Sequence, residues 1–214
     1  MQTRRTFIKN GLVLIAGSSG LVSYTASASG DGPHYGMIIL KERCMGCNSC
    51  ASACKLQNGT AQGHFLTHIE QEEVGEFPDA KMTFTPDGCR HCAEPFCLDS
   101  CEVNAIHKLA NGIVVTDWGT CTGDGACVDA CPFNARFVDP VEQKADSCDF
   151  CLSLLSKGSL PACVTSCPAS ARLFGDIKNP EGEFAKALRI ARLSSDFTTT
   201  NMNYLDKQDG RIQS

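Results

Sequence analysis

Three bulk properties narrow the class of this protein: a small size, an acidic charge balance and an unusual number of cysteines. The chain has 214 residues, with 19 Lys and Arg against 24 Asp and Glu, and 15 Cys. Its length suits one compact domain, and its acidity argues against nucleic acid as a partner, because phosphate binding calls for clustered Lys and Arg. Beyond residue 28 no stretch of about twenty apolar residues occurs, so we expect no direct membrane span.

Residues 1–28 are expected to be a twin-arginine signal peptide. Arg4 and Arg5 stand in the run TRRTFIK, an uncharged segment follows from residue 11, and the small residues ASA offer cleavage after Ala28. The alternative is a membrane anchor, but the segment is short and rich in Gly and Ser. Since the twin-arginine route is associated with folded, cofactor-loaded proteins, we expect a periplasmic protein that reaches the membrane through a partner subunit.

The cysteines fall into four groups, and their spacing is the strongest chemical signal in the chain. The groups are Cys44, Cys47, Cys50 and Cys54; Cys89, Cys92, Cys97 and Cys101; Cys121, Cys127 and Cys131; and Cys148, Cys151, Cys163 and Cys167. The first has the CxxCxxCxxxC spacing of bacterial ferredoxins, and in the third Asp124 stands where the second cysteine is expected. The first three cysteines of such a motif wrap a loop around one cubane, while the fourth ligates the cluster of a partner motif. The spacing therefore predicts iron–sulfur clusters.

Two other uses of these cysteines compete with the iron–sulfur interpretation. A disulfide framework fits an exported protein, but an odd number of cysteines leaves one thiol over, and CxxC pairs close small, reactive rings. A zinc site is usually built from two ligand pairs, whereas triplets of cysteines occur here. An exported binding protein, stabilised by disulfides or zinc and without a redox role, is thus the alternative from a different class.

An internal repeat ends each of the last three cysteine groups. Three nine-residue segments align with one another, namely residues 97–105, 127–135 and 163–171. A short apolar stretch, predicted to be a strand, begins at the end of each, and Asn111-Gly112 and Asp139-Pro140 mark turns. This order of loop, helical turn and strand is that of half a ferredoxin. We therefore expect an α+β fold in which residues 29–180 form two tandem bacterial ferredoxin-like units, with short strands, short helices and long loops around the clusters.

Residues 181–214 are expected to form a C-terminal helix and tail. Phe184, Leu188 and Ala191 recur at helical spacing within residues 183–197, which predicts a helix that packs on its own domain or docks on a partner. Residues 198–214 are mostly polar, and we expect an extended arm that contacts a partner.

The motif order resembles the iron–sulfur subunits of the dimethyl sulfoxide reductase group, which includes polysulfide, thiosulfate, tetrathionate and formate-dependent nitrite reductase systems. The resemblance covers about residues 34–180 and rests on the four motifs and on segments such as ADSCDFC, LPAC and GDIKNP. It implies that motif one pairs with motif four and motif two with motif three. The implied ligand sets are Cys44, Cys47, Cys50 and Cys167; Cys89, Cys92, Cys97 and Cys131; Cys121, Cys127 and Cys101, with or without Asp124; and Cys148, Cys151, Cys163 and Cys54.

The same resemblance implies an electron-transfer subunit without a catalytic centre of its own. Such a subunit relays single electrons between a membrane quinol-linked subunit and a molybdopterin catalytic subunit of a periplasmic respiratory reductase, with a sulfur oxyanion or polysulfide system favoured. The alternatives within redox chemistry are an electron-transfer subunit of a hydrogenase or nitrite reductase system and a free-standing polyferredoxin. Analogy of this kind indicates the role better than the substrate.

Asp124 sets one cluster apart from the other three. A carboxylate is a harder ligand than a thiolate, so we expect three [4Fe–4S] clusters plus one that is Asp-ligated [4Fe–4S], three-Cys [4Fe–4S] or [3Fe–4S]. The competing interpretation is a solvated loop residue between Gly123 and Gly125. Among other residues beside the cysteines, His91 is not expected to bind metal. The basic side chains there are expected to be solvated rather than to stabilise reduced clusters; they are Arg43, Lys55, Arg90 and Arg136.

Overall fold

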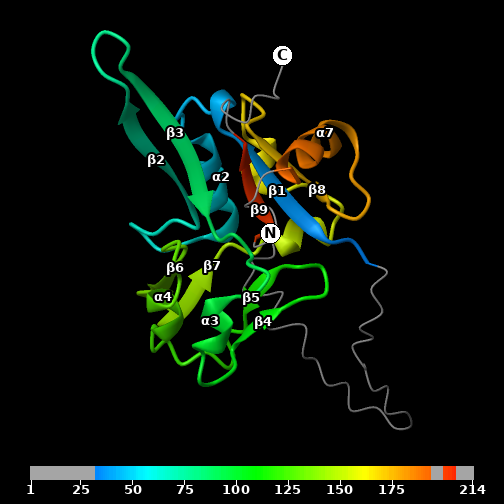
Figure 1. Ribbon diagram of the computed structural model, residues 1–214. Helices are drawn as coiled ribbons and strands as arrows, with labels where there is room; N and C mark the ends of the chain where they lie inside the picture. The colour runs from blue at the N-terminus through cyan, green and yellow to red at the C-terminus, as the bar shows by residue number, and fades with distance from the viewer. Residues whose placement is uncertain (1–31, 194–199, 206–214) are drawn as a thin grey trace.

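The computed structural model describes residues 32–193 and 200–205. The expected signal peptide with Arg4, Arg5 and the cleavage point after Ala28 lies outside these residues. We divide the described chain into a central half, residues 89–147, and a terminal half, which is the remainder. The central half carries cysteine motifs two and three, and the terminal half carries motifs one and four (Figure 1).

The core of the terminal half is a three-stranded sheet covered by one helix. Strand β1 (Tyr35–Leu40) lies in the middle, antiparallel to β8 (Arg172–Asp176) and parallel to β9 (Met202–Leu205). Helix α7 (Gly182–Ala191) lies beside this sheet (Figure 1). Its apolar face is buried against the sheet in one cluster, which consists of Ile38, Leu40, Leu173, Phe184, Ala187, Leu188, Ala191 and Leu205. The apolar residues expected to form a helical face therefore pack on their own domain, as the first of the two alternatives predicted.

Strand β9 corrects the expectation of a partner-contacting arm for part of the tail. Met202 and Leu205 are 2% and 0% exposed, and the strand pairs with β1 from Met37 to Leu40. The physical reason is that three apolar side chains in a polar segment suffice for a strand when a sheet edge is free to receive them. Tail residues 198–199 and 206–214 lie outside the described part of the chain.

The rest of the terminal half consists of one long hairpin and short helices. Strands β2 (Thr67–Val74) and β3 (Lys81–Gly88) pair along their whole length and extend away from the body of the molecule (Figure 1). Helix α2 (Ser49–Asn58) carries Cys50 and Cys54 on its buried side. Three further short helices are η1 (Lys41–Arg43), α5 (Leu152–Leu155) and α6 (Ala162–Thr165).

The central half is built from two hairpins and two single-turn helices. Strands β4 (Ile106–Lys108) and β5 (Val114–Thr116) form one hairpin, and β6 (Arg136–Asp139) and β7 (Lys144–Ser147) form the other. The helices are α3 (Phe96–Asp99) and α4 (Ala126–Asp129). The predicted turns at Asn111-Gly112 and Asp139-Pro140 are confirmed, and Gly112 has a φ of +84°, a left-handed conformation that favours glycine.

The architecture confirms short helices and strands in small sheets, as expected for an α+β iron–sulfur domain. Among the described residues, three sheets have two strands and one has three. The predicted strands after the repeated segments correspond to β4, β6 and β8. In the described part of the chain no helix is long and apolar enough to cross a bilayer. The tandem arrangement of two ferredoxin-like units stays a prediction.

Candidate metal centres

All fifteen cysteines lie within the described residues, and each is a free thiol. Most of them are buried or half-buried, with Cys47 as the exposed member. The structure therefore presents unpaired sulfurs, gathered from loops and short helices, that could serve as metal ligands.

Four cysteines expected to share one cluster line a single cavity in the central half. The cavity has a volume of about 350 Å³, including space open to solvent, and its sulfurs come from Cys89, Cys92, Cys97 and Cys131. Three of these residues belong to motif two and the fourth to motif three. The remaining walls include Phe133 and Arg136.

A second quartet lines a cavity of about 320 Å³ in the terminal half, again counted with its open part. Its sulfurs come from Cys54, Cys148, Cys151 and Cys163, so motif four supplies three residues and motif one the fourth. In residues 32–193 and 200–205 no three His, Cys, Asp or Glu side chains converge on a point that would suit one metal ion. A single zinc ion would need its thiolates about 2.3 Å from a common centre; here the sulfurs surround a space.

The other two expected ligand sets are also brought within electrostatic range. Burial raises the pKa of Cys44, and charges on Cys50 and Cys167 raise it further. In the same way Cys127 is influenced by Cys121 and Cys101. Apart from Cys47 and Asp124, the residues of each expected set therefore lie close in space, and each set draws on two motifs.

The pKa values of the buried cysteines show that ionised thiols are unfavourable at these sites when no metal is bound. Burial raises the pKa of Cys54 to about 12, with the charges on Cys163 and Cys151 adding to the effect. Burial also raises the pKa of Cys89 to about 12 and that of Cys148 well above its usual value. A buried thiolate needs a cation beside it, and metal coordination supplies one while releasing the proton.

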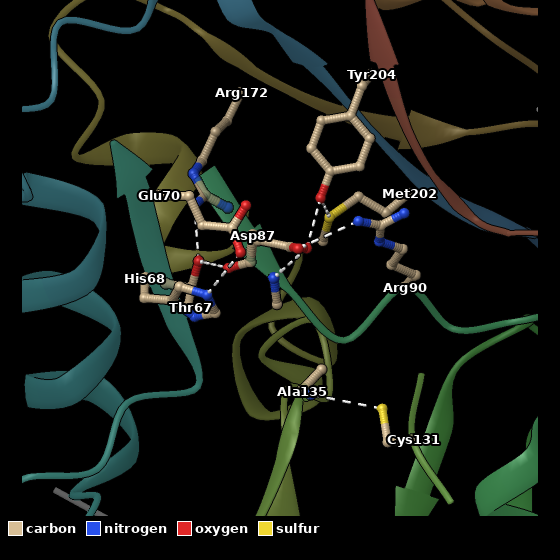
Figure 2. A network of polar contacts seen from close by, with 11 residues as sticks. Thr67, His68, Glu70, Asp87, Arg90, Cys131, Ala135, Arg172, Met202 and Tyr204 are labelled. Carbon is tan, nitrogen blue, oxygen red and sulfur yellow. Dashed lines mark hydrogen bonds and ion pairs between the residues drawn. The ribbon is translucent and has the colours of Figure 1, made fainter. Parts of the chain in front are cut away.

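Backbone N–H groups donate to the sulfur of the last cysteine in three of the motifs. The N–H of Ala105 donates to Cys101 Sγ at 3.2 Å, and the same contact joins Ala135 to Cys131 at 3.5 Å (Figure 2). The third pair is Ala171 and Cys167, at 3.3 Å. These contacts come from the repeated segment, in which the residue before each alanine has a positive φ. Hydrogen bonds to sulfur are among the determinants of iron–sulfur potentials.

Asp124 is exposed and hydrogen-bonded within its own loop. Its Oδ1 accepts from the N–H of Ala126 and its Oδ2 from the hydroxyl of Thr122, both at 2.8 Å, and these bonds lower its pKa. Cys47 holds the equivalent place in motif one and behaves alike: it is exposed, and its sulfur contacts Ser49, two residues on. The carboxylate of Asp124 thus stands where a ligand thiol stands in another motif.

Two arginines are buried among the sulfurs, which corrects the expectation that Arg136 is a solvated surface residue. Arg136 is 4% exposed, and sequence reasoning missed its counterpart Arg172, which is 3% exposed. The only signal in the sequence was their shared position, five residues after the last cysteine of motifs three and four. For Arg43 the expectation of a surface residue holds, because 39% of its side chain is exposed.

The buried donors without a partner lie beside the sulfur groups. Among the described side chains they are the Nε of Arg90, Arg136 and Arg172 and the Nε2 of His91. An unsatisfied buried N–H is costly, and the sulfides of an iron–sulfur cluster are acceptors. Together with the lined cavities and the free thiols, these donors fit such a cluster.

His91 is a neutral residue at the contact between the two halves. It is 0% exposed, and burial together with the charge on Arg136 lowers its pKa to about 3. Its Nδ1 accepts from the N–H of Val114 at 2.9 Å, so its proton is on Nε2. The centroid of its ring lies 3.9 Å from that of Phe150, a residue that stands between Cys148 and Cys151 in the sequence. The loop of motif two therefore contacts the loop of motif four.

A polar network anchors Arg172 to the base of the long hairpin. Its Nη2 donates to Thr67 Oγ1 at 2.7 Å, and the Thr67 hydroxyl donates to the Asp87 carbonyl at 2.6 Å (Figure 2). The Asp87 carboxylate accepts from Tyr204 at 2.6 Å and pairs with Arg90 at 3.2 Å. Asp87 and Tyr204 are further residues that the sequence did not single out, and they join β3 to β9.

The folded elements and the sulfur sites together define a ferredoxin-type iron–sulfur protein. Family models agree: a 4Fe-4S dicluster domain matches residues 80–177, which include motifs two to four, and a 4Fe-4S binding domain matches residues 41–60, which include motif one.

Similar proteins narrow the family. A tetrathionate reductase subunit of Salmonella typhimurium is 42% identical over 160 residues, which are 74% of this chain and 64% of the relative. Protein NrfC of Escherichia coli is 38% identical over 87% of this chain and 86% of its own length. A sulfite dehydrogenase subunit of Allochromatium vinosum is 33% identical over 72% of this chain and 73% of its own length. The chain belongs to this family of iron–sulfur subunits, as the motif order indicated.

Proposed function

We propose that the chain is the electron-transfer subunit of an oxidoreductase complex and relays single electrons through four iron–sulfur centres. The observation that carries the proposal is the pair of cavities, each lined by four cysteines from two motifs. Bound clusters supply the one-electron chemistry. The protein's own residues hold the clusters, exclude water and tune their potentials.

Four sites follow, in two tandem ferredoxin-like units. Each draws three ligands from one motif and a fourth from its partner motif, and at site 3 Asp124 takes the place of one thiol. Site 1 is Cys44, Cys47, Cys50 and Cys167; site 2 is Cys89, Cys92, Cys97 and Cys131; site 3 is Cys101, Cys121, Cys127 and Asp124; site 4 is Cys54, Cys148, Cys151 and Cys163. Sites 1 and 4 form the unit in the terminal half, and sites 2 and 3 form the unit in the central half.

Contacts between the sites support a linear order of 1, 4, 2 and 3. Arg172 lies among the cysteines of sites 1 and 4, and Arg136 among those of sites 2 and 3. The ring contact between His91 and Phe150 joins sites 2 and 4. The exposed members Cys47 and Asp124 belong to the two end sites, where electrons can enter and leave through partner subunits.

Paired cysteine variants test the ligand sets. Cys89→Ser and Cys131→Ser are expected to alter the same EPR signal in a potentiometric titration of anaerobically purified protein. Cys101→Ser and Cys127→Ser are expected to alter a different one. The proposal fails if Cys131→Ser alters the signal that Cys127→Ser alters, or if the purified protein is colourless and contains no iron and sulfide.

Site 3 is proposed to have a carboxylate corner. Asp124 occupies the place of a ligand thiol, and a harder ligand holds iron less firmly. Asp124→Cys is expected to shift one redox transition and to abolish any three-iron EPR signal, whereas Asp129→Asn, in the adjacent α4 helix, serves as the control and leaves all transitions in place. An unchanged titration of Asp124→Cys would argue against ligation.

The partners proposed for the complex are a molybdopterin catalytic subunit and a membrane quinol-linked subunit. A sulfur oxyanion system is favoured because two of the relatives are a tetrathionate reductase subunit and a sulfite dehydrogenase subunit. Affinity purification of the chain from its native membranes tests this: a large molybdenum-containing subunit is expected to copurify. Its absence from a cluster-loaded preparation would favour a free-standing polyferredoxin.

Export by the twin-arginine route completes the proposal. Replacement of both Arg4 and Arg5 by Lys is expected to keep the cluster-loaded protein in the cytoplasm, while the unmodified chain reaches the periplasm without residues 1–28. Cell fractionation and mass spectrometry of the mature N-terminus are the measurements. Periplasmic accumulation of the double variant would contradict this route.

A further inference from the structure

Arg136 and Arg172 occupy equivalent positions in the two halves of the molecule. Each follows the last cysteine of a motif by five residues and begins a strand, β6 or β8. Each is nearly inaccessible to solvent. The same place in motif two holds the buried apolar Ile106, so each half contains one such arginine.

The anchoring of the two guanidinium groups is also alike. Arg136 donates from Nη2 to Thr116 Oγ1 at 2.5 Å, and Arg172 donates from Nη2 to Thr67 Oγ1 at 2.7 Å. In both cases the threonine stands at the end of a hairpin strand. Arg136 has a second anchor in Ser147 Oγ at 3.1 Å. Because threonine hydroxyls carry no charge, these anchors hold each guanidinium without neutralising it.

The sulfurs that surround both arginines belong to cysteines of two sites. Arg136 donates to Cys97 Sγ of site 2 at 3.8 Å and also contacts Cys127 of site 3. Arg172 contacts Cys50 of site 1 and is attracted by Cys163 and Cys148 of site 4. Within the described residues neither arginine forms an ion pair with a carboxylate. The Nε of each is a buried donor without a protein acceptor.

A fixed cation between two redox sites acts on both of them. Reduction adds one negative charge to a cluster, and a nearby guanidinium stabilises that charge most strongly where water is excluded. It also weakens the repulsion between electrons on neighbouring clusters. Arginine suits this position because its guanidinium stays charged and its fork of donors reaches in several directions.

We propose that Arg136 and Arg172 are fixed positive charges of the electron relay, and that each raises the reduction potentials of both clusters in its own unit. Arg136 serves sites 2 and 3, and Arg172 serves sites 1 and 4. This inference rests on the ligand sets of the proposed function.

The test is a potentiometric EPR titration of cluster-loaded Arg136→Gln and Arg172→Gln. Arg136→Gln is expected to lower the midpoint potentials of two transitions, the ones that Cys89→Ser and Cys127→Ser alter, and to leave the other two in place. Arg172→Gln should lower the midpoint potentials of sites 1 and 4 and leave those of sites 2 and 3 in place. Arg43→Gln is the matched control, because Arg43 adjoins the ligand Cys44 in sequence but pairs with Glu183 at 2.6 Å on the surface. It should move no transition.

Three results from the Gln variants would overturn the inference: unchanged midpoint potentials in both variants, a shift confined to one cluster of a unit, or equal shifts of all four transitions. If a Gln variant loses its clusters, the Lys variants decide. Lysine keeps the charge but concentrates it at one point, so Arg136→Lys should move sites 2 and 3 by unequal amounts and leave sites 1 and 4 unchanged. Unchanged potentials in both Lys variants would also overturn it. Absence of iron and sulfide from the unmodified protein would instead refute the proposed function.

Discussion

The two halves of the molecule carry equivalent groups of cysteines but differ in their hydrophobic cores. In the terminal half a three-stranded sheet and a ten-residue helix bury a cluster of large side chains. In the central half the corresponding hydrophobic core consists of two alanines, Ile106, Val114 and two cysteines, around hairpins of three or four residues per strand. Isolated two-stranded hairpins are marginally stable in water. We therefore expect the central half to depend on bound clusters for its fold, whereas the terminal half has a hydrophobic core of its own.

Removal of iron is the strongest way to test this difference. We expect amide exchange in residues 89–147 to approach that of an unfolded chain in the cluster-free protein, because the metal links that join its loops are lost. Strands β1 and β8 should remain protected. Hydrogen–deuterium exchange of loaded and cluster-free protein, followed by mass spectrometry, measures both halves at once. Equal loss of protection in the two halves would contradict the comparison.

A cavity in the terminal core should have a large but local effect. Leu188 is 2% exposed, and Leu188→Ala is expected to lower the free energy of unfolding by about 2–5 kcal/mol. The matched control is Leu193→Ala, since Leu193 is 66% exposed and its truncation should cost at most about 0.5 kcal/mol.

Two spectroscopic probes separate the halves in that experiment. The single Trp118 belongs to the central half and donates to the Ala145 carbonyl, so its fluorescence reports that half. Far-UV circular dichroism is weighted toward the longer helices α2 and α7 of the terminal half. In urea titrations of cluster-free protein, Leu188→Ala should shift the dichroism transition, whereas Trp118 fluorescence should show no transition, because the central half is expected to be unfolded without its clusters. A Trp118 transition that shifts together with the dichroism would mean that the halves unfold as one unit.

Much of the central half could be predicted because its signals are local. The Asn111-Gly112 turn between apolar residues selects a hairpin. In motifs two to four the repeated segment predicts a helical turn before the last cysteine and a strand after it. The cysteine spacing likewise reveals which residues are candidate ligands, since a loop around a cluster needs close, regular sulfurs.

The rest depends on contacts between distant parts of the chain. Strand β9 pairs with β1 across more than 160 residues, and a polar tail gives no local sign of that pairing. Arginine is rarely fully buried, so the solvated interpretation of Arg136 was reasonable from sequence but wrong. Its burial follows from a cavity whose walls come from motifs two and three.

High pH should destabilise the terminal half of the cluster-free protein. Burial raises the pKa of Cys54 to about 12 and that of Cys151 to about 11, and Cys148 lies well above its usual value. In the central half the pKa of Cys89 alone is raised as far, to about 12. A thiol whose pKa is raised in the folded state contributes its full stabilisation below its unfolded pKa of 9.0. This stabilisation is lost as the pH rises toward the folded pKa.

The terminal half should therefore lose more stability than the central half between about pH 9 and 11. The measurement is a series of urea titrations with the same two probes. Cluster-loaded protein is the control, because its metal-bound thiolates have no proton to lose. A dichroism transition that keeps its urea midpoint between pH 9 and 11 would contradict the assignment of the buried thiols to the terminal half.

The smallest effect is expected at the surface of the terminal half, where Arg43 of η1 pairs with Glu183 of α7 at 2.6 Å. The two side chains are 39% and 49% exposed, so water and salt screen the attraction. Arg43→Gln should lower the free energy of unfolding by about 0.2–1 kcal/mol, and the difference should shrink as ionic strength rises. Urea titration of the variant and of Glu183→Gln, at low and high salt, is the measurement. A loss comparable to that of Leu188→Ala would show that charge pairing rather than the apolar face of α7 attaches this helix to the sheet, and the contrast between the halves would then rest on electrostatics instead of packing.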